Sequence, residues 1–318
     1  MCYRILDTAG VYRLVRPLRR MWNAWAARGF AKHVLARRPD AVVVTHFLPA
    51  DVCNSLKQAG RLSAPVVVVV TDLHPHRFWL TPRAEAMVAA VPQSADALRA
   101  CGVDPSRIHV LGIPVGPAFA DRPDPATLRR DLGLESGRLT ALVTSGGTTV
   151  GRFEETVESL MALEAEFPGR LQLIVVCGQD AWARRRLEAR AAGARMPVRV
   201  HGFIETMAQV MAASDLVVSK AGGLTVSEAL ASGKPLVVYH IVPGQEELNA
   251  RYVVEHGAGV IAQRPGEAAA VIAGCLTDPA RLERMRDGAQ ALSRPHAARD
   301  IIERVVIPLV RCQAKNDA

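Results

Sequence analysis

A glycine pair that leads into a helix-like run is the strongest sign of chemistry in this sequence. In SKAGGLTVSEALASGKPLVV (219–238), Gly222 and Gly223 follow an apolar run, and Thr225 and Glu228 lie just inside the expected helix. The free N–H groups and the dipole of a helix start favour a phosphate, and Glu228 is placed to accept hydrogen bonds from ribose hydroxyls. The alternative is a T-x-x-E capping box, which needs no ligand. Taken alone, this stretch slightly favours the cap.

A second glycine turn occurs in LTALVTSGGTTVGR (139–152), where Gly146 and Gly147 follow a strand-like run and Gly151 precedes a helix. It matches neither G-x-x-x-x-G-K-[ST] nor G-x-G-x-x-G, and a tight turn by itself explains such glycines. Two such turns in one α/β domain, both after strands, nevertheless favour a bound nucleotide diphosphate.

Polar side chains cluster in the segment that follows the run PLVVYH. Gln245, Glu246 and Asn249 lie within five residues of one another, and amides and carboxylates of this kind suit the hydroxyl groups of a sugar. The alternative is an ordinary solvated start of a helix.

Candidate acids and bases follow the apolar runs at 41–44 and 66–70. TDLHPHRF offers Asp72, His74 and His76, and THFLPAD offers His46 and Asp51. A histidine at the end of a strand is suited to take a hydroxyl proton near neutral pH. The Asp-x-His-x-His spacing also resembles a set of metal ligands, but we expect no metal because no clear further ligand follows. We predict an acceptor-site role, with catalysis, for Asp72 and His74.

The elements that would position these residues alternate between strand and helix patterns. Short β-branched runs of this type are typical of strands buried on both faces of a parallel sheet. The expected strands lie in two series, at 41–47, 66–72, 86–91 and 108–115, and then at 139–147, 171–178, 198–204, 215–223, 235–240 and 257–262. A segment rich in Pro and Asp, 116–127, separates the two series. We therefore predict two doubly wound, Rossmann-like α/β domains, 1–120 and 121–318, with the ligand in a cleft between them.

Composition limits the class of protein. The chain has 318 residues, of which 49% are hydrophobic and 22% charged, as in globular proteins. The six cysteines are scattered without a CxxC pair, which favours a reducing cytoplasm over a disulfide framework. The sequence shows no secretory signal, and its longest aliphatic run is too short to span a bilayer.

Positive charge is concentrated at the start of the chain. Residues 1–40 hold nine basic and two acidic side chains, a net charge of +7 out of +8 for the whole chain. This distribution indicates a local anionic contact and not a nucleic-acid-binding body. Val11, Leu14, Trp22 and Trp25 recur there at helical spacing, so this segment is either an amphipathic helix in a membrane interface or a helix packed on its domain.

The paired motifs resemble a known family. SKAGGLTVSEALASGKPLVV and GQEELNARYVV look like the donor-binding half of the GT-B glycosyltransferases that include the monogalactosyldiacylglycerol synthases, the processive diacylglycerol glucosyltransferases and, more distantly, the peptidoglycan N-acetylglucosaminyltransferase. PDAVVVTHFLPADV, VVTDLHPHRFW and VLGIPVGPAF resemble the N-terminal half of the glycolipid branch. The resemblance covers most of residues 40–290.

The resemblance implies an inverting transfer from a UDP-sugar that needs no metal or other cofactor. Departing UDP would be stabilised by helix N-termini. Carried over by motif, Gly146, Gly147 and Thr148 would approach the phosphates, Phe203 would lie beside the uracil, Gly222, Gly223, Leu224 and Thr225 would bind the diphosphate, Glu228 the ribose, and Gln245, Glu246 and Asn249 the donor sugar.

The sequence departs from the family at its start, where those enzymes carry a strand and a glycine-rich loop that ends in the histidine favoured as general base. Met1 enters inside the expected N-terminal domain, which we therefore expect to be incomplete. A sheet without its first strand would expose apolar surface or need a partner chain to cover it.

The sequence thus predicts a hexosyltransferase that moves sugar from a UDP-sugar to diacylglycerol or a related glycolipid. We expect it in the cytoplasm, peripheral on the inner face of the cell membrane and in contact with anionic lipid. Two alternatives stay open: a catalytically impaired, truncated UDP-sugar-binding relative, and a peptidoglycan-type N-acetylglucosaminyltransferase.

Overall fold

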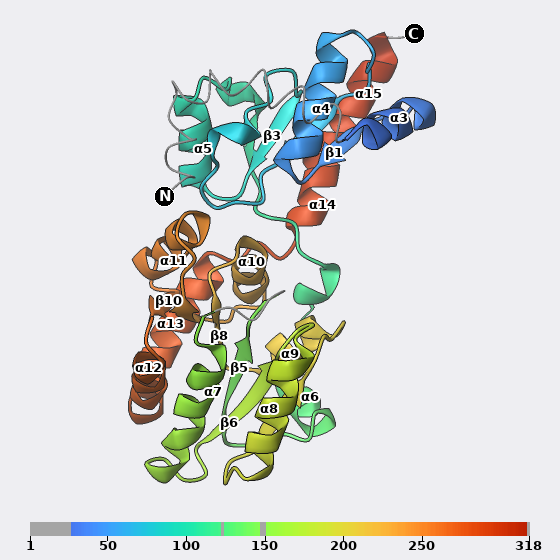
Figure 1. The fold of residues 1–318 in the computed structure, drawn as a ribbon. Coiled ribbons are helices and arrows are strands. Elements are labelled where there is room, and N and C mark those ends of the chain that lie inside the picture. The colour runs from blue at the N-terminus through green and yellow to red at the C-terminus, as the bar shows by residue number, and fades with distance from the viewer. Residues whose placement is uncertain (1–26, 122–123, 147–150, 317–318) are drawn as a thin grey trace. The chain divides into compact units, whose positions relative to one another are not determined.

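The computed structural model describes residues 27–121, 124–146 and 151–316, which form two compact units (Figure 1). The first unit ends at Pro114 and takes back the chain from His296 onward, whereas the second runs from Val115 to Pro295. The predicted division at 120/121 is thus close to the observed one, but the prediction that the C-terminal segment stays with the second domain differs from the structure. The predicted amphipathic start, with Trp22 and Trp25, lies outside the described residues.

The first unit is built on a four-stranded parallel sheet in the order β1-β2-β3-β4. Its strands are β1 (Val42–Val44), β2 (Val66–Val69), β3 (Ala86–Ala89) and β4 (Ile108–Val110). All four predicted strands are confirmed, but each is shorter than predicted. The first ends at Val44, because Phe47 already begins a helix whose N-cap is His46.

Helices cover both faces of this sheet. α3 (Arg28–Arg37), α4 (Phe47–Gln58) and α5 (Pro92–Ala100) contribute to the core cluster that contains Val66 and Val68. The neighbouring residues Val67 and Val69 point to the opposite face, because side chains alternate along a strand. They meet Ile301 and Val305 of the returning C-terminal segment. That segment consists of α14 (Ala297–Ile301), a π-helical turn η5 (Ile302–Val306) and α15 (Ile307–Asn316).

Short 3-10 turns occur in both units. They lie at Arg77–Trp79 and Pro105–Arg107 in the first unit, and at Pro117–Phe119 and Ala162–Ala165 in the second.

The second unit contains a six-stranded parallel sheet in the order β10-β9-β8-β5-β6-β7. Its strands are β5 (Leu139–Thr144), β6 (Leu171–Val176), β7 (Val198–His201), β8 (Leu216–Lys220), β9 (Leu236–His240) and β10 (Gly259–Ile261). All six predicted strands are confirmed. The chain builds outward from β5 to β7 and then returns to the other side of β5 with β8. This reversal is the topological switch point of a doubly wound sheet.

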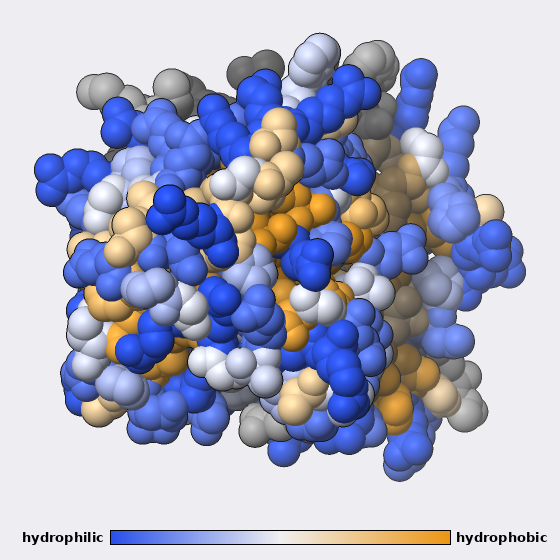
Figure 2. All heavy atoms as spheres, turned by 90° about the horizontal axis from the view of Figure 1, so that it is seen from below, coloured by the Kyte–Doolittle hydropathy of each residue, from blue (hydrophilic) through white to orange (hydrophobic). Residues whose placement is uncertain are grey.

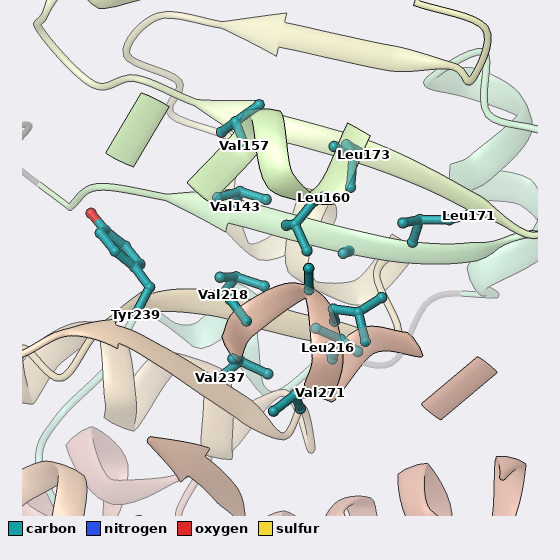
Figure 3. Packing of buried hydrophobic residues seen from close by; sticks show 14 of the residues in the cluster. Val143, Val157, Leu160, Leu171, Leu173, Leu216, Val218, Val237, Tyr239 and Val271 are labelled. Atoms are coloured by element: carbon teal, nitrogen blue, oxygen red, sulfur yellow. The ribbon is translucent and has the colours of Figure 1, made fainter. Parts of the chain in front are cut away.

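Eight helices of the described residues accompany this sheet: α6 (Pro125–Asp131), α7 (Phe153–Met161), α8 (Ala181–Ala192), α9 (Met207–Ala213), α10 (Gly223–Ala231), α11 (Gln245–Glu255), α12 (Pro265–Thr277) and α13 (Pro279–Ala291). One core cluster joins alternate strand residues such as Val143, Leu173 and Val218 to Leu160 of α7 and Val271 of α12 (Figure 3). The α9 and α10 helices contact β5 and β8.

Most large apolar side chains are buried. In the view from below, hydrophobic residues reach the surface in separate patches, near the middle and at the lower left, among hydrophilic ones (Figure 2). Phe203 and Leu224 are exceptions, with 69% and 55% of their surface exposed. Both belong to segments that follow strands of the second sheet.

Candidate functional site

The two glycine turns of the sequence meet at the switch point of the second sheet. β5 and β8 are parallel neighbours, with Ala141 opposite Leu216. Their carboxyl ends therefore lie at the same edge, where ligands of doubly wound sheets bind. Gly146 follows β5 with a φ of 70°, a left-handed conformation that favours glycine, and its N–H donates to Thr144 Oγ1 at 3.3 Å. Gly222 follows β8 at the same edge.

The start of α10 decides between the two interpretations of the glycine pair. Its N-cap is Gly222, its first residue is Gly223, and no side chain of the described residues caps it. Thr225 is therefore already the third residue of the helix. The capping-box interpretation is wrong, because a T-x-x-E box needs Thr225 itself at the N-cap. The first helical hydrogen bond runs from Val226 N to the Gly222 carbonyl at 2.9 Å, so the N–H groups before Val226 are not part of the helical ladder.

A pocket of about 480 Å³ opens beside this helix start. Five residues that the sequence singled out line it together: Gly146, Phe203, Leu224, Thr225 and Glu228. Sequence reasoning missed the other lining residues, which are Thr144, Val176, Gly178, Gln179, Ile204, Met207 and Met211. The glycine that ends the predicted stretch 171–178 was the available signal for Gly178. The pocket combines an apolar wall with a carboxylate and a helix start, which is the composition of a small-molecule site.

The surroundings of Glu228 change the pKa of its carboxyl group. Burial raises its pKa from 4.5 to about 7, because a charged carboxylate loses hydration inside the pocket wall. Leu224 precedes Glu228 by four residues and Thr225 precedes it by three, so all three side chains share one face of α10. A titratable group of perturbed pKa in a pocket marks a functional-site candidate.

Asp72 is the center of a second cluster, in the first unit. Its Oδ2 accepts a hydrogen bond from Trp79 Nε1 at 2.7 Å and lies 3.7 Å from His76 Nε2. Both contacts use the same carboxylate oxygen, Oδ2. Burial raises the pKa of Asp72, while the Trp79 hydrogen bond and the charge of His46 act in the opposite direction. Phe47 packs edge-on against His76 with ring centroids 5.1 Å apart.

Asp72 and His74, the two residues predicted for the acceptor site, are not in contact in the structure. His74 is exposed, whereas His76 is buried and is the neighbour of Asp72. The backbone N–H of Phe78 donates to His76 Nδ1 at 3.2 Å, so the proton of a neutral His76 lies on Nε2, toward Asp72. Because His76 is only 5% exposed, it is better placed to orient Asp72 than to contact a substrate.

Comparison with known proteins places this geometry in a family. The model described as the glycosyltransferase family 28 C-terminal domain matches residues 140–305, just over half of the chain. The chain belongs to glycosyltransferase family 28. The model described as monogalactosyldiacylglycerol (MGDG) synthase matches residues 11–115.

Two relatives and one solved structure illustrate the similarity. Monogalactosyldiacylglycerol synthase 2 of Arabidopsis thaliana is 30% identical over 291 residues, which cover 88% of this chain and 61% of that protein. Processive diacylglycerol beta-glucosyltransferase of Bacillus pumilus is 26% identical over 268 residues, 84% of this chain and 68% of that protein. The chain therefore spans about three fifths of the plant relative. S. aureus MnaA, solved with UDP, superposes with a TM-score of 0.70 at 15% identity, covering 91% of this chain and 81% of that one. The predicted GT-B class of the fold is confirmed.

Several residues of this chain that were predicted to bind the donor are not among those that line the pocket. Gly222 and Gly223 form the start of α10, while Gly147 and Thr148 lie outside the described residues. Glu246, in the first turn of α11, accepts a hydrogen bond from Val242 N at 3.0 Å. Its carboxylate therefore orders the loop before α11.

Two amides of α11 carry oxygens that are buried without a hydrogen-bond partner among the described residues, Gln245 Oε1 and Asn249 Oδ1. Asn249 is only 1% exposed, and its Nδ2 donates to the carbonyl of Ala221 at 2.9 Å. So deeply buried a side chain holds the loop that leads to Gly222. Gln245 is half-buried, and the contacts of Gln245 and Asn249 with the donor sugar stay predictions.

Two further observations concern the described part of this family 28 chain. No cluster of three or more His, Cys, Asp or Glu side chains in it is arranged to hold a metal ion. None of its helices combines the length and the apolar character needed to cross a bilayer.

The raised pKa of Glu228 leads to a stability prediction. Between pH 4.5 and about 7, folded Glu228 binds a proton that the unfolded chain has released, so its contribution to stability is lost as pH rises through this window. We expect Glu228→Gln to stabilise the unliganded chain at pH 8 by about 1 kcal/mol after discounting for solvent screening, roughly 2–4 °C in Tm. Thermal melts at pH 8 and pH 5 measure this, and the gain should shrink at pH 5. The exposed Glu255→Gln is the control, and an equal gain in both variants would contradict the assignment.

Proposed function

We propose that this chain is an inverting glycosyltransferase that moves a hexose from a UDP-sugar to diacylglycerol or a related glycolipid. The observation that carries the proposal is the pocket at the switch point, where Gly146, Phe203, Leu224, Thr225 and Glu228 meet the uncapped start of α10. The names of the two relatives, a galactolipid synthase and a diacylglycerol glucosyltransferase, support a lipid acceptor. S. aureus MnaA, solved with UDP, supports a UDP-sugar donor.

The donor is proposed to enter this pocket as follows. The exposed ring of Phe203 covers the uracil, and the Glu228 carboxylate accepts hydrogen bonds from the ribose hydroxyls. The N–H groups at the start of α10 bind the diphosphate, where the helix dipole favours negative charge. Gln245 and Glu246 hold the sugar. These donors stabilise UDP as the bond to the sugar breaks, so the reaction is proposed to need no metal or cofactor, and EDTA should leave the rate unchanged.

The acceptor is proposed to bind the first unit. Asp72 accepts the proton of the attacking hydroxyl through Oδ1, while Trp79 and His76 hold Oδ2. The charge of +7 in residues 1–40 is proposed to hold the enzyme at the cytoplasmic surface of an anionic membrane.

Gly222 offers a test of the donor site that does not disturb the fold. A Cβ built there meets no atom within 4 Å, and its φ of −65° suits any residue. Gly222→Val should therefore fold, yet place methyl groups where the diphosphate approaches the helix. We expect UDP affinity, measured by calorimetry, to fall at least tenfold, since a displaced phosphate loses its charge-assisted hydrogen bonds.

Gly266→Val is the matched control, because Gly266 also has open space around its Cβ and lies in the first turn of another helix, α12. Equal UDP affinity in the parent and in Gly222→Val would refute the donor site. UDP binding without transfer to diacylglycerol would favour the alternative of a UDP-sugar-binding chain that a partner completes. Transfer of N-acetylglucosamine to a peptidoglycan precursor would favour the third alternative.

A further inference from the structure

An apolar loop tip lies between β9 and α11. Ile241, Val242 and Pro243 form it, between the end of β9 at His240 and the N-cap of α11 at Gly244. Val242 is 41% exposed and Pro243 is exposed as well, whereas Ile241 is half-buried. We call these three residues the β9–α11 tip. Single exposed apolar residues are ordinary on a protein surface, so the tip is informative through its conformation and its place in the fold.

Two features fix the conformation of the β9–α11 tip. The backbone N–H of Val242 donates to Glu246 Oε2 at 3.0 Å, so the main chain of the tip is tied to the first turn of α11. Gly244 has a φ of 118° and a ψ of −118°, a conformation that residues with a side chain rarely adopt. The tip is therefore a defined surface of the second unit that keeps Val242 exposed in one place.

The order of the strands places the tip beside the sugar that is to be transferred. In the order β9-β8-β5-β6-β7, the proposed uracil contact Phe203 follows β7, and the proposed diphosphate contacts, Gly146 and Gly222, follow β5 and β8. A UDP-sugar laid along this edge with its base at β7 has its hexose at the end of the next strand, β9. The tip begins one residue after that strand. The acceptor hydroxyl has to reach the anomeric carbon of this hexose, so the acceptor passes close to the tip.

We propose that the β9–α11 tip binds the lipid acceptor, with Val242 packed against the apolar part of the diacylglycerol next to its hydroxyl group. This inference rests on the proposed function and assigns to the second unit a residue that selects a lipid over a polar acceptor. Burying valine against acyl carbons is favourable, whereas a polar acceptor at the same place would leave its polar groups without partners. The tip carries no charged side chain that could serve such an acceptor instead.

The test measures KM for dioleoylglycerol in mixed micelles, with a UDP-hexose as donor. Val242→Ser should raise this KM about tenfold, because serine lacks most of the apolar surface that the lipid would cover. The kcat value, the UDP affinity in calorimetry and the melting temperature should stay as in the parent, since only binding of the acceptor is weakened. Val242→Leu keeps the apolar contact and should hold KM within about twofold of the parent.

Two facts make these variants suitable for the test. The hydrogen bond to Glu246 comes from the backbone of Val242, so both variants keep it. Val254→Ser is the matched control, because Val254 lies on α11 and is 39% exposed, close to the exposure of Val242. An equal rise of KM in Val242→Ser and Val254→Ser would contradict the proposal, since it would show a general effect of the apolar surface.

A membrane contact is the alternative use of an exposed apolar tip, and sedimentation with vesicles separates the two. The vesicles contain phosphatidylglycerol and phosphatidylcholine but no diacylglycerol. Under the proposal, Val242→Ser sediments with them as well as the parent does. Weaker sedimentation of Val242→Ser than of Val254→Ser would mean that the tip inserts into the bilayer, and it would overturn the assignment to the acceptor.

The remaining outcomes keep this inference separate from the proposed function. If the parent transfers hexose to dioleoylglycerol and Val242→Ser has the KM of the parent, the role of the tip is refuted and the glycosyltransferase stands. The same holds if kcat falls at an unchanged KM, since the tip would then act on the chemical step. If Val242→Ser also loses UDP, the tip shapes the donor site and does not bind the lipid. If the parent transfers no hexose to dioleoylglycerol, the proposed function falls, and this inference falls with it.

Discussion

A chain in which asparagine replaces Asp72 is expected to transfer sugar 10²- to 10⁴-fold more slowly than the parent, with its affinity for UDP unchanged. Asparagine keeps an oxygen that accepts the 2.7 Å hydrogen bond from Trp79, so the local packing is retained. It cannot accept the proton of the attacking hydroxyl. The measurement is kcat with a UDP-hexose and diacylglycerol, beside calorimetry with UDP.

Two comparisons decide whether Asp72 is the base. His74→Gln changes the exposed histidine of the same loop, and the larger loss of kcat identifies the base among the two predicted residues. Because burial raises the pKa of Asp72, kcat of the parent should fall as pH drops through a value above the ordinary carboxylate range, and this limb should vanish in Asp72→Asn. Full activity in both variants would refute the assignment of the base to this loop.

Replacing Gly259 by alanine is expected to destabilise the second unit by about 2–4 kcal/mol. Gly259 begins β10 opposite Leu236, and an added Cβ would overlap the Leu236 carbonyl oxygen and lie 2.7 Å from Val253 Cγ1. A backbone carbonyl in a sheet cannot move aside as the end of a flexible side chain can. Urea denaturation followed by far-UV circular dichroism measures the change.

Gly266→Ala is the control for this effect, since nothing lies within 4 Å of a Cβ built there and alanine favours the helix. That variant should be as stable as the parent or up to about 1 kcal/mol more stable. Equal stability of Gly259→Ala and the parent would show that β10 and α11 can separate without cost.

The sequence by itself determined the order and type of the strands. Runs such as Val66–Val69 and Leu171–Val176 are β-branched or aliphatic throughout, and turn residues bound them. These signals are local, so all ten predicted strands were found. The two glycine turns, at Gly146 and Gly222, were predicted for the same reason: each follows a strand, and parallel strands end at a common edge.

Only the tertiary structure decided what those turns border. Phe203 and Glu228 are 25 residues apart in the sequence, and the pocket that joins them depends on the sheet order that brings β5 beside β8. The burial that raises the pKa of Glu228 comes from the same packing. The sequence could not separate a cap from a ligand site at Thr225, because both need a polar residue near a helix start and differ only in where the helix begins.

The partner of Asp72 and the packing of the C-terminal helices also depend on the tertiary structure. His74 and His76 are equivalent candidates in the sequence, and the turn at Arg77–Trp79 buries one and exposes the other. Ile301 and Val305 pack against Val67 and Val69 of the first unit, a contact that the sequence analysis did not predict. Helical periodicity in a sequence indicates that one face of a helix is apolar. The surface which that face packs against depends on contacts between distant segments, here more than 200 residues apart.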